Sequence, residues 1–198
     1  MPDFKLILAS TSATRVKILR GAGLVFEAQP AKVNEKGLHA IHAHLHPDDL
    51  PIELARAKSL SLSTTHPDAM IIGSDQVLNF HGKPLHKAKT IAEARDKLKA
   101  LRGHTHALYS AVACAQGGKI VFSDCQSVSL TMRNFSDAFL EDYLIKAQDA
   151  AMNSAGCYHY EGLGAQLFEK VEGDYYAILG LPLLPLLAFL RQSDIVPS

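Results

Sequence analysis

The sequence predicts an α/β fold in which a mixed sheet lines a cleft. Apolar runs of strand length alternate with longer amphipathic runs through the first half of the chain, which is typical of strand–helix–strand units. Two later apolar runs flank "QGGK" at 116–119, and this pattern indicates an antiparallel hairpin. No internal repeat or low-complexity linker interrupts the 198 residues. We therefore expect a single domain over residues 1–198.

Composition narrows the functional classes. Hydrophobic residues make up 47% of the chain and charged residues 20%, which is ordinary for a globular enzyme. Lys+Arg and Asp+Glu balance at 20 each, so net charge does not favour binding of a nucleic acid polymer, and any anion site must be local. No apolar run approaches the roughly 20 residues of a membrane span, and "MPDFKLILAS" has no charged region followed by a long apolar one, so we expect no secretion leader. The three cysteines lack a CxxC spacing, which favours free thiols in the cytoplasm.

The first half of the chain opens with a strand and a helix whose ends are signalled by specific residues. A Ser or Thr can cap the helix that follows "FKLILA", and Gly21 and Gly23 stop it. The expected elements are a strand over 4–9, a helix over 10–23, a strand over 24–32, a polar His-rich connection over 36–49 and a helix over 50–66.

The stretch "MIIGSDQVL" at 70–78 raises a question about its carboxylate. Met70–Ile72 indicate a buried strand, which we expect to end at a Gly-Ser turn with Asp75 before Val77 and Leu78 resume the apolar pattern. An unpaired carboxylate at the end of a core strand would be costly. Asp75 is therefore either a structural cap or a functional acid that faces the cleft.

The second half gives the clearest helix of the chain. In "KTIAEARDKLKALRG" (89–103) apolar side chains recur on one face, and Gly103 ends the run. Ser136 is placed to cap a helix over 136–147. The remaining expected elements are hairpin strands over 106–115 and 119–133 and a final strand pair and helix within 165–191.

Ser10, Ser12 and Arg15 lie together where the first strand meets the first helix. The N-terminal N–H groups of a helix favour an anion, and hydroxyls and a guanidinium add donors for phosphate oxygens. Ordinary N-capping by serine explains the same stretch and is the commoner arrangement.

Two acids and two lysines form the other candidates. Glu35 and Asp75 at strand ends could share a divalent cation, and Lys83 and Lys87 could bind phosphate as point charges. Each could instead be a solvated loop residue, as most charged residues are.

The histidines at 39, 42, 44 and 46 do not have a standard zinc spacing, and no acidic or thiol ligand is interleaved. We expect a solvated loop there.

Taken together, these stretches resemble the Maf family of nucleoside triphosphate pyrophosphatases. The short matches are "LASTS" with Arg15, "VNE" at 33–35, "LARAKS" at 54–59, "GSDQV" at 73–77, "LHKA" at 85–88 and "RGHTHALYSAV" with His106. The long C-terminal stretch 155–183, "AGCYHYEGLGAQLFEKVEGDYYAILGLPL", follows the family signature almost position for position. The chain departs from the family at Ala13 and Ala88, where proline is usual, and at Asn34, where Asp is common.

The resemblance implies a fold and a reaction. The fold is an elongated mixed sheet flanked by helices, similar to inosine triphosphate pyrophosphatases, with a nucleotide-binding cleft between two lobes. The reaction is hydrolysis between the α and β phosphorus atoms of a nucleoside triphosphate, a house-cleaning role in the cytoplasm, carried out by a homodimer.

The resemblance also assigns roles to residues. Asp75, Glu35 and Lys87 are the implied catalytic set, and Glu35 and Asp75 hold Mg²⁺ or Mn²⁺. The implied substrate-binding residues are Ser10, Ser12, Arg15, Lys58, Thr14, Gln76 and Glu161. The last three tune base choice. Gln76 and Glu161 resemble the 7-methyl-GTP branch, whereas Thr14 fits neither that branch nor the dTTP/UTP branch well.

Two alternatives remain open at the level of sequence. A non-catalytic nucleotide-binding regulator of septum formation is one, although simple binding would not need the acidic pair. The related inosine triphosphate pyrophosphatase type is the other, and the C-terminal signature points away from it. The absence of a Gly-rich Walker loop argues against a kinase or an ATP-driven motor.

Overall fold

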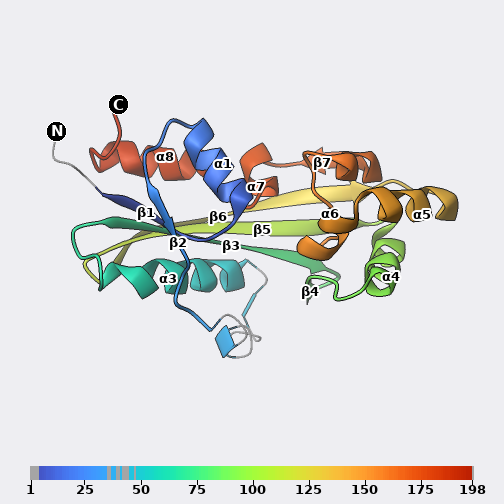
Figure 1. Cartoon of the computed structure of the whole chain (residues 1–198), viewed down its shortest axis with the longest axis horizontal. Helices are drawn as coiled ribbons and strands as arrows, with labels where there is room; N and C mark the ends of the chain where they lie inside the picture. Colours follow the sequence, from blue (N-terminus) through green and yellow to red (C-terminus); the bar gives the residue numbers. More distant parts are fainter. Residues whose placement is uncertain (1–4, 35–36, 39–40, 42–44, 47, 198) are drawn as a thin grey trace. The chain divides into compact units, whose positions relative to one another are not determined.

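The computed structural model describes residues 5–34, 37–38, 41, 45–46 and 48–197 (Figure 1). Its strands form one mixed sheet of order β2-β1-β3-β5-β6-β7, with β4 paired to β3 off this path. The strands are β1 (Leu6–Ala9), β2 (Glu27–Gln29), β3 (Met70–Phe80), β4 (Lys83–Leu85), β5 (Thr105–Gln116), β6 (Lys119–Met132) and β7 (Phe168–Glu172).

Helices separate or follow these strands, which confirms the α/β prediction. They are α1 (Ala13–Gly21), α3 (Asp49–Ser63), α4 (Ile91–Leu101), α5 (Asp137–Lys146), α6 (Gln148–Asn153), the 3₁₀ helix η1 (Leu163–Leu167), α7 (Tyr175–Ile178) and α8 (Leu183–Gln192). None of the described helices is long and apolar enough to cross a membrane.

The chain forms two compact units. The first contains Met1–Gln76, Tyr109–Gln126 and Asp174–Ser198, and the second contains Val77–Leu108 and Ser127–Gly173. A single domain over 1–198 stays a prediction.

The core of the first unit follows from strand alternation. β1 pairs in parallel with both β2 and β3, and Ile7 lies opposite Ile71. Leu8 and Ile72 pack into a cluster with α1 and α8, whereas Ile7 and Ile71 pack into a cluster with Leu62 of α3. Figure 1 shows α1 and α8 on one face of the strands and α3 on the other. Both faces of β1 are therefore buried, as its continuous apolar sequence requires.

The second unit is held by shorter elements. β7 pairs antiparallel with the end of β6, and the β3–β4 hairpin turns at His81 and Gly82, both with positive φ. Thr90 and Ser136 cap α4 and α5 through their side-chain oxygens, as the sequence predicts for Ser136.

Three sequence-based expectations about elements are wrong. β3 does not end at a Gly-Ser turn but runs without interruption from Met70 to Phe80. The strand expected over 24–32 shortens to β2, because Val25 is almost fully exposed and Pro30 lacks the N–H to extend the ladder. The expected final strand pair is instead η1, the single strand β7 and the short helix α7.

Candidate active site

The carboxyl end of β1 is a switch point in the chain topology. From β1 the chain passes through α1 to β2 on one side, and it then crosses through α3 to β3 on the other. Crevices at such points bind ligands in open α/β sheets, because the two connections diverge and leave the strand end uncovered. Ser10 follows β1 directly.

Ser10, Ser12 and Arg15 form a connected group at this strand end. Ser12 is the N-cap of α1, and its Oγ accepts from the Arg15 N–H at 3.5 Å. The Ser10 Oγ accepts from the Ser12 N–H at 3.2 Å and from Arg15 Nη1 at 3.4 Å. Arg15 Nε donates to the Gly180 carbonyl at 2.9 Å. The capping and the clustering of anion donors are therefore both present, and one does not exclude the other.

Asp75 lies in a buried ion pair. Its Oδ1 accepts from the ammonium of Lys58 on α3 at 2.7 Å, and the side chains of Lys58 and Asp75 are only 8% and 13% exposed. Removing two charges from water is costly unless they pair closely. The pairing bears on the question that the sequence raised. Asp75 is neither a turn residue nor a helix cap, but a residue of β3 whose carboxylate pairs with a lysine of α3.

Glycine at position 73 makes this pair possible. A Cβ at Gly73 would lie 2.1 Å from the Ala55 carbonyl oxygen and 2.6 Å from the Ser59 nitrogen, both in the backbone of α3. The missing side chain lets α3 approach β3 closely, which brings Lys58 onto Asp75. The glycine that suggested a turn therefore marks a close helix–strand contact.

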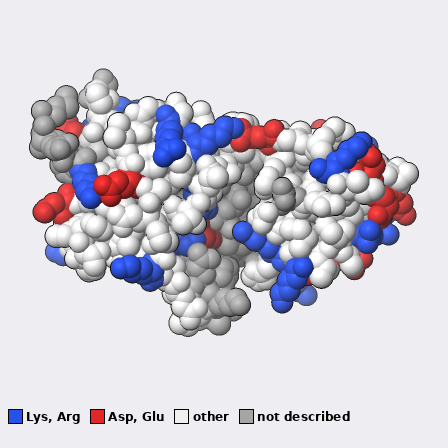
Figure 2. All heavy atoms as spheres, in the orientation of Figure 1, with Lys and Arg blue, Asp and Glu red and all other residues white. Residues whose placement is uncertain are grey.

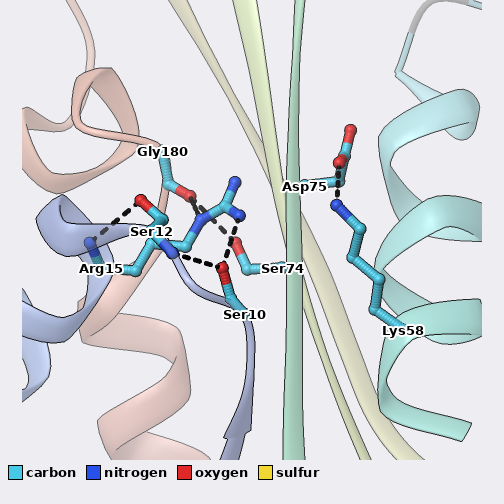
Figure 3. A network of polar contacts seen from close by, with 7 residues as sticks. All are labelled: Ser10, Ser12, Arg15, Lys58, Ser74, Asp75 and Gly180. Atoms are coloured by element: carbon cyan, nitrogen blue, oxygen red, sulfur yellow. Dashed lines mark hydrogen bonds and ion pairs between the residues drawn. The ribbon is translucent and has the colours of Figure 1, made fainter. Parts of the chain in front are cut away.

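The two groups lie on opposite sides of β3 (Figure 3). Figure 3 shows Ser10, Ser12, Arg15 and Gly180 on the side of Ser74, and Lys58 on the side of Asp75. Successive strand residues alternate between faces, so Ser74 and Asp75 must point apart. Ser74 Oγ donates to the same Gly180 carbonyl that accepts from Arg15, at 2.9 Å.

The residues assigned to base choice have different surroundings. Gln76 Nε2 donates to Ser110 Oγ and to the carbonyls of Ala177 and Ile178 at 2.8–3.0 Å, so its amide is held by protein partners. Thr14 is half-buried on α1. Glu161 belongs to the second unit, where it is exposed.

Lys83 and Lys87 are exposed residues of the second unit. Glu35 lies outside the described residues, as do His39, His42 and His44, whereas His46 pairs with Asp48.

Metal ligation rests on few described groups. No three His, Cys, Asp or Glu side chains gather as a metal site within the described part of the chain. Asp75 supplies a hard carboxylate oxygen, which suits Mg²⁺ or Mn²⁺, and Mg²⁺ commonly binds through one or two carboxylates together with substrate phosphates. Of the two expected ligands, Asp75 is described, with its Oδ1 paired to Lys58, and Glu35 lies outside the described residues.

His106, from a motif of the sequence, is buried in the second unit. Its Nε2 contacts the Tyr158 hydroxyl at 2.8 Å, and its Nδ1 is buried without a hydrogen-bond partner in the described structure. Burial lowers the pKa of His106 to about 4 and raises that of Tyr158 above its ordinary value. The imidazole of His106 is therefore uncharged in the folded protein at neutral pH.

Sequence reasoning missed three polar groups near the site, namely Ser74, Ser110 and the Gly180 carbonyl. Ser74 and Ser110 are fully buried, and each donates to a carbonyl in the segment 177–180. Serines inside apolar strands were the available signal, because a buried hydroxyl needs a partner. The partners themselves are 67 and 106 residues away in sequence and could not be assigned from it.

The chain also matches a known protein family. The family model described as Maf-like protein matches residues 5–193, nearly the whole chain. The chain belongs to the Maf-like family.

Its Maf-like relatives match along almost their entire length. The chain is 46% identical over 192 residues to a protein of Maricaulis maris named nucleoside triphosphate pyrophosphatase, covering 97% of this chain and 98% of the relative. It is 43% identical over 190 residues to a Rhizobium etli protein named 7-methyl-GTP pyrophosphatase, covering 95% and 96%. Among solved structures, a HAM1 protein from Coxiella burnetii superposes with a TM-score of 0.44 at 13% identity, covering 67% of this chain and 74% of that chain.

Proposed function

We propose that this Maf-like protein hydrolyses nucleoside triphosphates to a nucleoside monophosphate and pyrophosphate. The observation that carries the proposal is the buried Asp75–Lys58 pair beside β1, with the hydroxyls and guanidinium of Ser10, Ser12 and Arg15 across β3. The names of the relatives from Maricaulis maris and Rhizobium etli support the same reaction.

Asp75 acts in the reaction as the proton acceptor. A water oxygen bonds to the α phosphorus, the bond from that phosphorus to the αβ-bridging oxygen breaks, and the electron pair leaves with pyrophosphate. The proton lost by the water passes to the Asp75 carboxylate. Lys58 keeps this carboxylate oriented and adds positive charge near the developing oxyanion, while Arg15 binds phosphate oxygens.

Mg²⁺ or Mn²⁺ is the cofactor in this proposal. Asp75, together with Glu35, would hold the ion, and Lys87 would add positive charge on the phosphates. When bound, the ion supplies positive charge against the phosphates and lowers the pKa of a coordinated water. The charges drawn in Figure 2 are interspersed over the face shown, which fits a small local anion site better than a broad basic surface.

A modified guanine nucleotide is the proposed substrate. Methylation at N7 gives guanine a positive charge that UTP and dTTP lack, and the carboxylate of Glu161 would favour that charge. The protein acts as a cytoplasmic homodimer with no nucleic acid polymer or membrane as partner. Glu161→Gln should then lower kcat/KM for 7-methyl-GTP several-fold more than for UTP, and equal losses would reject the charge contact.

The reaction is tested with a panel of nucleoside triphosphates, with and without Mg²⁺ or Mn²⁺, by measuring monophosphate and pyrophosphate. Asp75→Asn should lower turnover by at least about 10²-fold, which is typical of losing a general base. Asp68→Asn is the matched control, because Asp68 is exposed two residues before β3. Orthophosphate in place of pyrophosphate would reject the assignment, and binding without hydrolysis would favour the non-catalytic regulator.

A further inference from the structure

The segment 177–180 consists of the last two residues of α7 and the two residues after it, and it accepts several side-chain hydrogen bonds from β3 and β5. Gln76 and Ser110 donate to the Ala177 carbonyl at 2.9 and 2.6 Å, and Gln76 also donates to Ile178 at 3.0 Å. Gln76 Nε2 and Ser110 Oγ are themselves joined at 2.8 Å. The Ala177 carbonyl also accepts from the Gly180 N–H at 3.1 Å. The side chains therefore add hydrogen bonds from β3 and β5 to the backbone turn that ends α7, and so tie this turn to the sheet.

The same segment ends at the residue that orients Arg15. The Gly180 carbonyl accepts from Arg15 Nε and from Ser74 Oγ, each at 2.9 Å. Gly180 has a φ of +92°, which residues with a side chain rarely adopt. A Cβ at this position would lie 3.7 Å from Arg15 Nη2. The direction of the Gly180 carbonyl therefore depends on how the segment 177–180 is held. The orientation of the guanidinium depends in turn on this carbonyl together with Ser10 Oγ.

We infer that Ser110 and Ser74 are positioning residues for the anion-binding Arg15, acting through the carbonyls of Ala177 and Gly180. Neither serine needs to touch substrate for this role, because both are fully buried. The inference rests on the proposed function only in taking Arg15 as a phosphate ligand. The group that Arg15 would bind is therefore the phosphate chain, which nucleoside triphosphates and inorganic pyrophosphate share.

Binding of inorganic pyrophosphate, measured by calorimetry, tests the inference without any turnover. Ser110→Ala should weaken pyrophosphate binding about tenfold, and Ser74→Ala should do the same through the second serine. Ser63→Ala is the matched control: Ser63 is also fully buried and donates to one helix carbonyl, that of Leu60, but it does not contact residues 177–180. The control should leave pyrophosphate affinity within about twofold of wild type.

A double-mutant cycle separates positioning from general loosening of the fold. In an Arg15→Ala background, Ser110→Ala should cause no further loss of affinity, because the residue through which it acts is gone. Equal additional losses in both backgrounds, or an unchanged affinity in both serine variants, would overturn the inference. Failure of the wild type to bind pyrophosphate would overturn it as well.

Kinetics add a second readout if the proposed hydrolysis is observed. Removing an interaction made equally in ground and transition states raises KM and leaves kcat nearly unchanged. The serine variants should therefore raise KM about tenfold with kcat within about threefold, unlike Asp75→Asn, which should lower kcat. A fall in kcat at constant KM would contradict the positioning role, whereas a wild type that binds pyrophosphate but hydrolyses nothing would reject only the proposed function.

Discussion

His106 should make the stability of the protein depend on pH between about 4 and 6.5. Its imidazole is almost fully buried against Tyr158, and its pKa falls from 6.5 to about 4 on folding because burial disfavours the charged ring. The unfolded chain therefore binds a proton at higher pH than the folded chain does. The stabilising effect is fully present above pH 6.5 and is lost as the pH falls toward 4.

The magnitude follows from the two pKa values. With 6.5 in the unfolded and about 4 in the folded chain, this group alone should lower the free energy of unfolding by about 2 kcal/mol at pH 5 and about 3 kcal/mol at pH 4, relative to pH 8. Carboxylates titrate in the same range, so the measured quantity is the difference between wild type and a variant that cannot gain a proton.

Urea unfolding of wild type and His106→Gln at pH 8, 6, 5 and 4 measures this difference. Glutamine can still hydrogen-bond to the Tyr158 hydroxyl but does not titrate, so its stability should fall less steeply with acid. His81→Asn is the control, because His81 is exposed with φ of 51°, a conformation that asparagine tolerates. Parallel stability curves for wild type and His106→Gln would refute the reasoning.

Two further predictions concern the contact between α3 and β3. Gly73→Ala should destabilise the fold by at least about 2 kcal/mol in urea unfolding, since its Cβ meets α3 backbone at 2.1 Å; Gly21→Ala, with nothing within 4 Å, should not. Equal stability of the two alanine variants would contradict the close contact. Lys58→Met should lower the free energy of unfolding by about 3–5 kcal/mol, because it leaves the Asp75 charge buried and unpaired. Adding Asp75→Asn should restore much of this stability without restoring activity. Lack of recovery in the double variant would mean that Lys58 stabilises by packing alone.

Local patterns were sufficient to predict most helices and the mixed sheet. Ser136 begins a helix where its side chain was expected to cap it, and Ser12 is the residue that caps α1 within the Ser/Thr stretch where a cap was expected. The apolar face of 89–103 became the buried face of α4. These features depend on neighbours within a few residues, so the sequence carries them directly.

Long-range contacts explain what the sequence could not predict. Gly73 looked like a turn because glycine favours turns, but its real constraint comes from the backbone of α3 at Ala55 and Ser59. The Asp75–Lys58 pair joins residues 17 positions apart, and the partners of Ser74 and Ser110 lie much further along the chain. Propensity and periodicity do not encode such partners, so the sequence could suggest candidate residues but not the side of β3 on which each candidate lies.

The discontinuity of the first unit has a consequence for how the chain folds during synthesis. β1 belongs to a core that also contains Leu186 and Leu190 of α8, more than 170 residues later. The ribosome must therefore release nearly the whole chain before this core can close, whereas the contacts of α4, α5 and α6 form among residues 91–153. Because non-local contacts slow folding, we expect the second unit to gain protection from hydrogen exchange before the first.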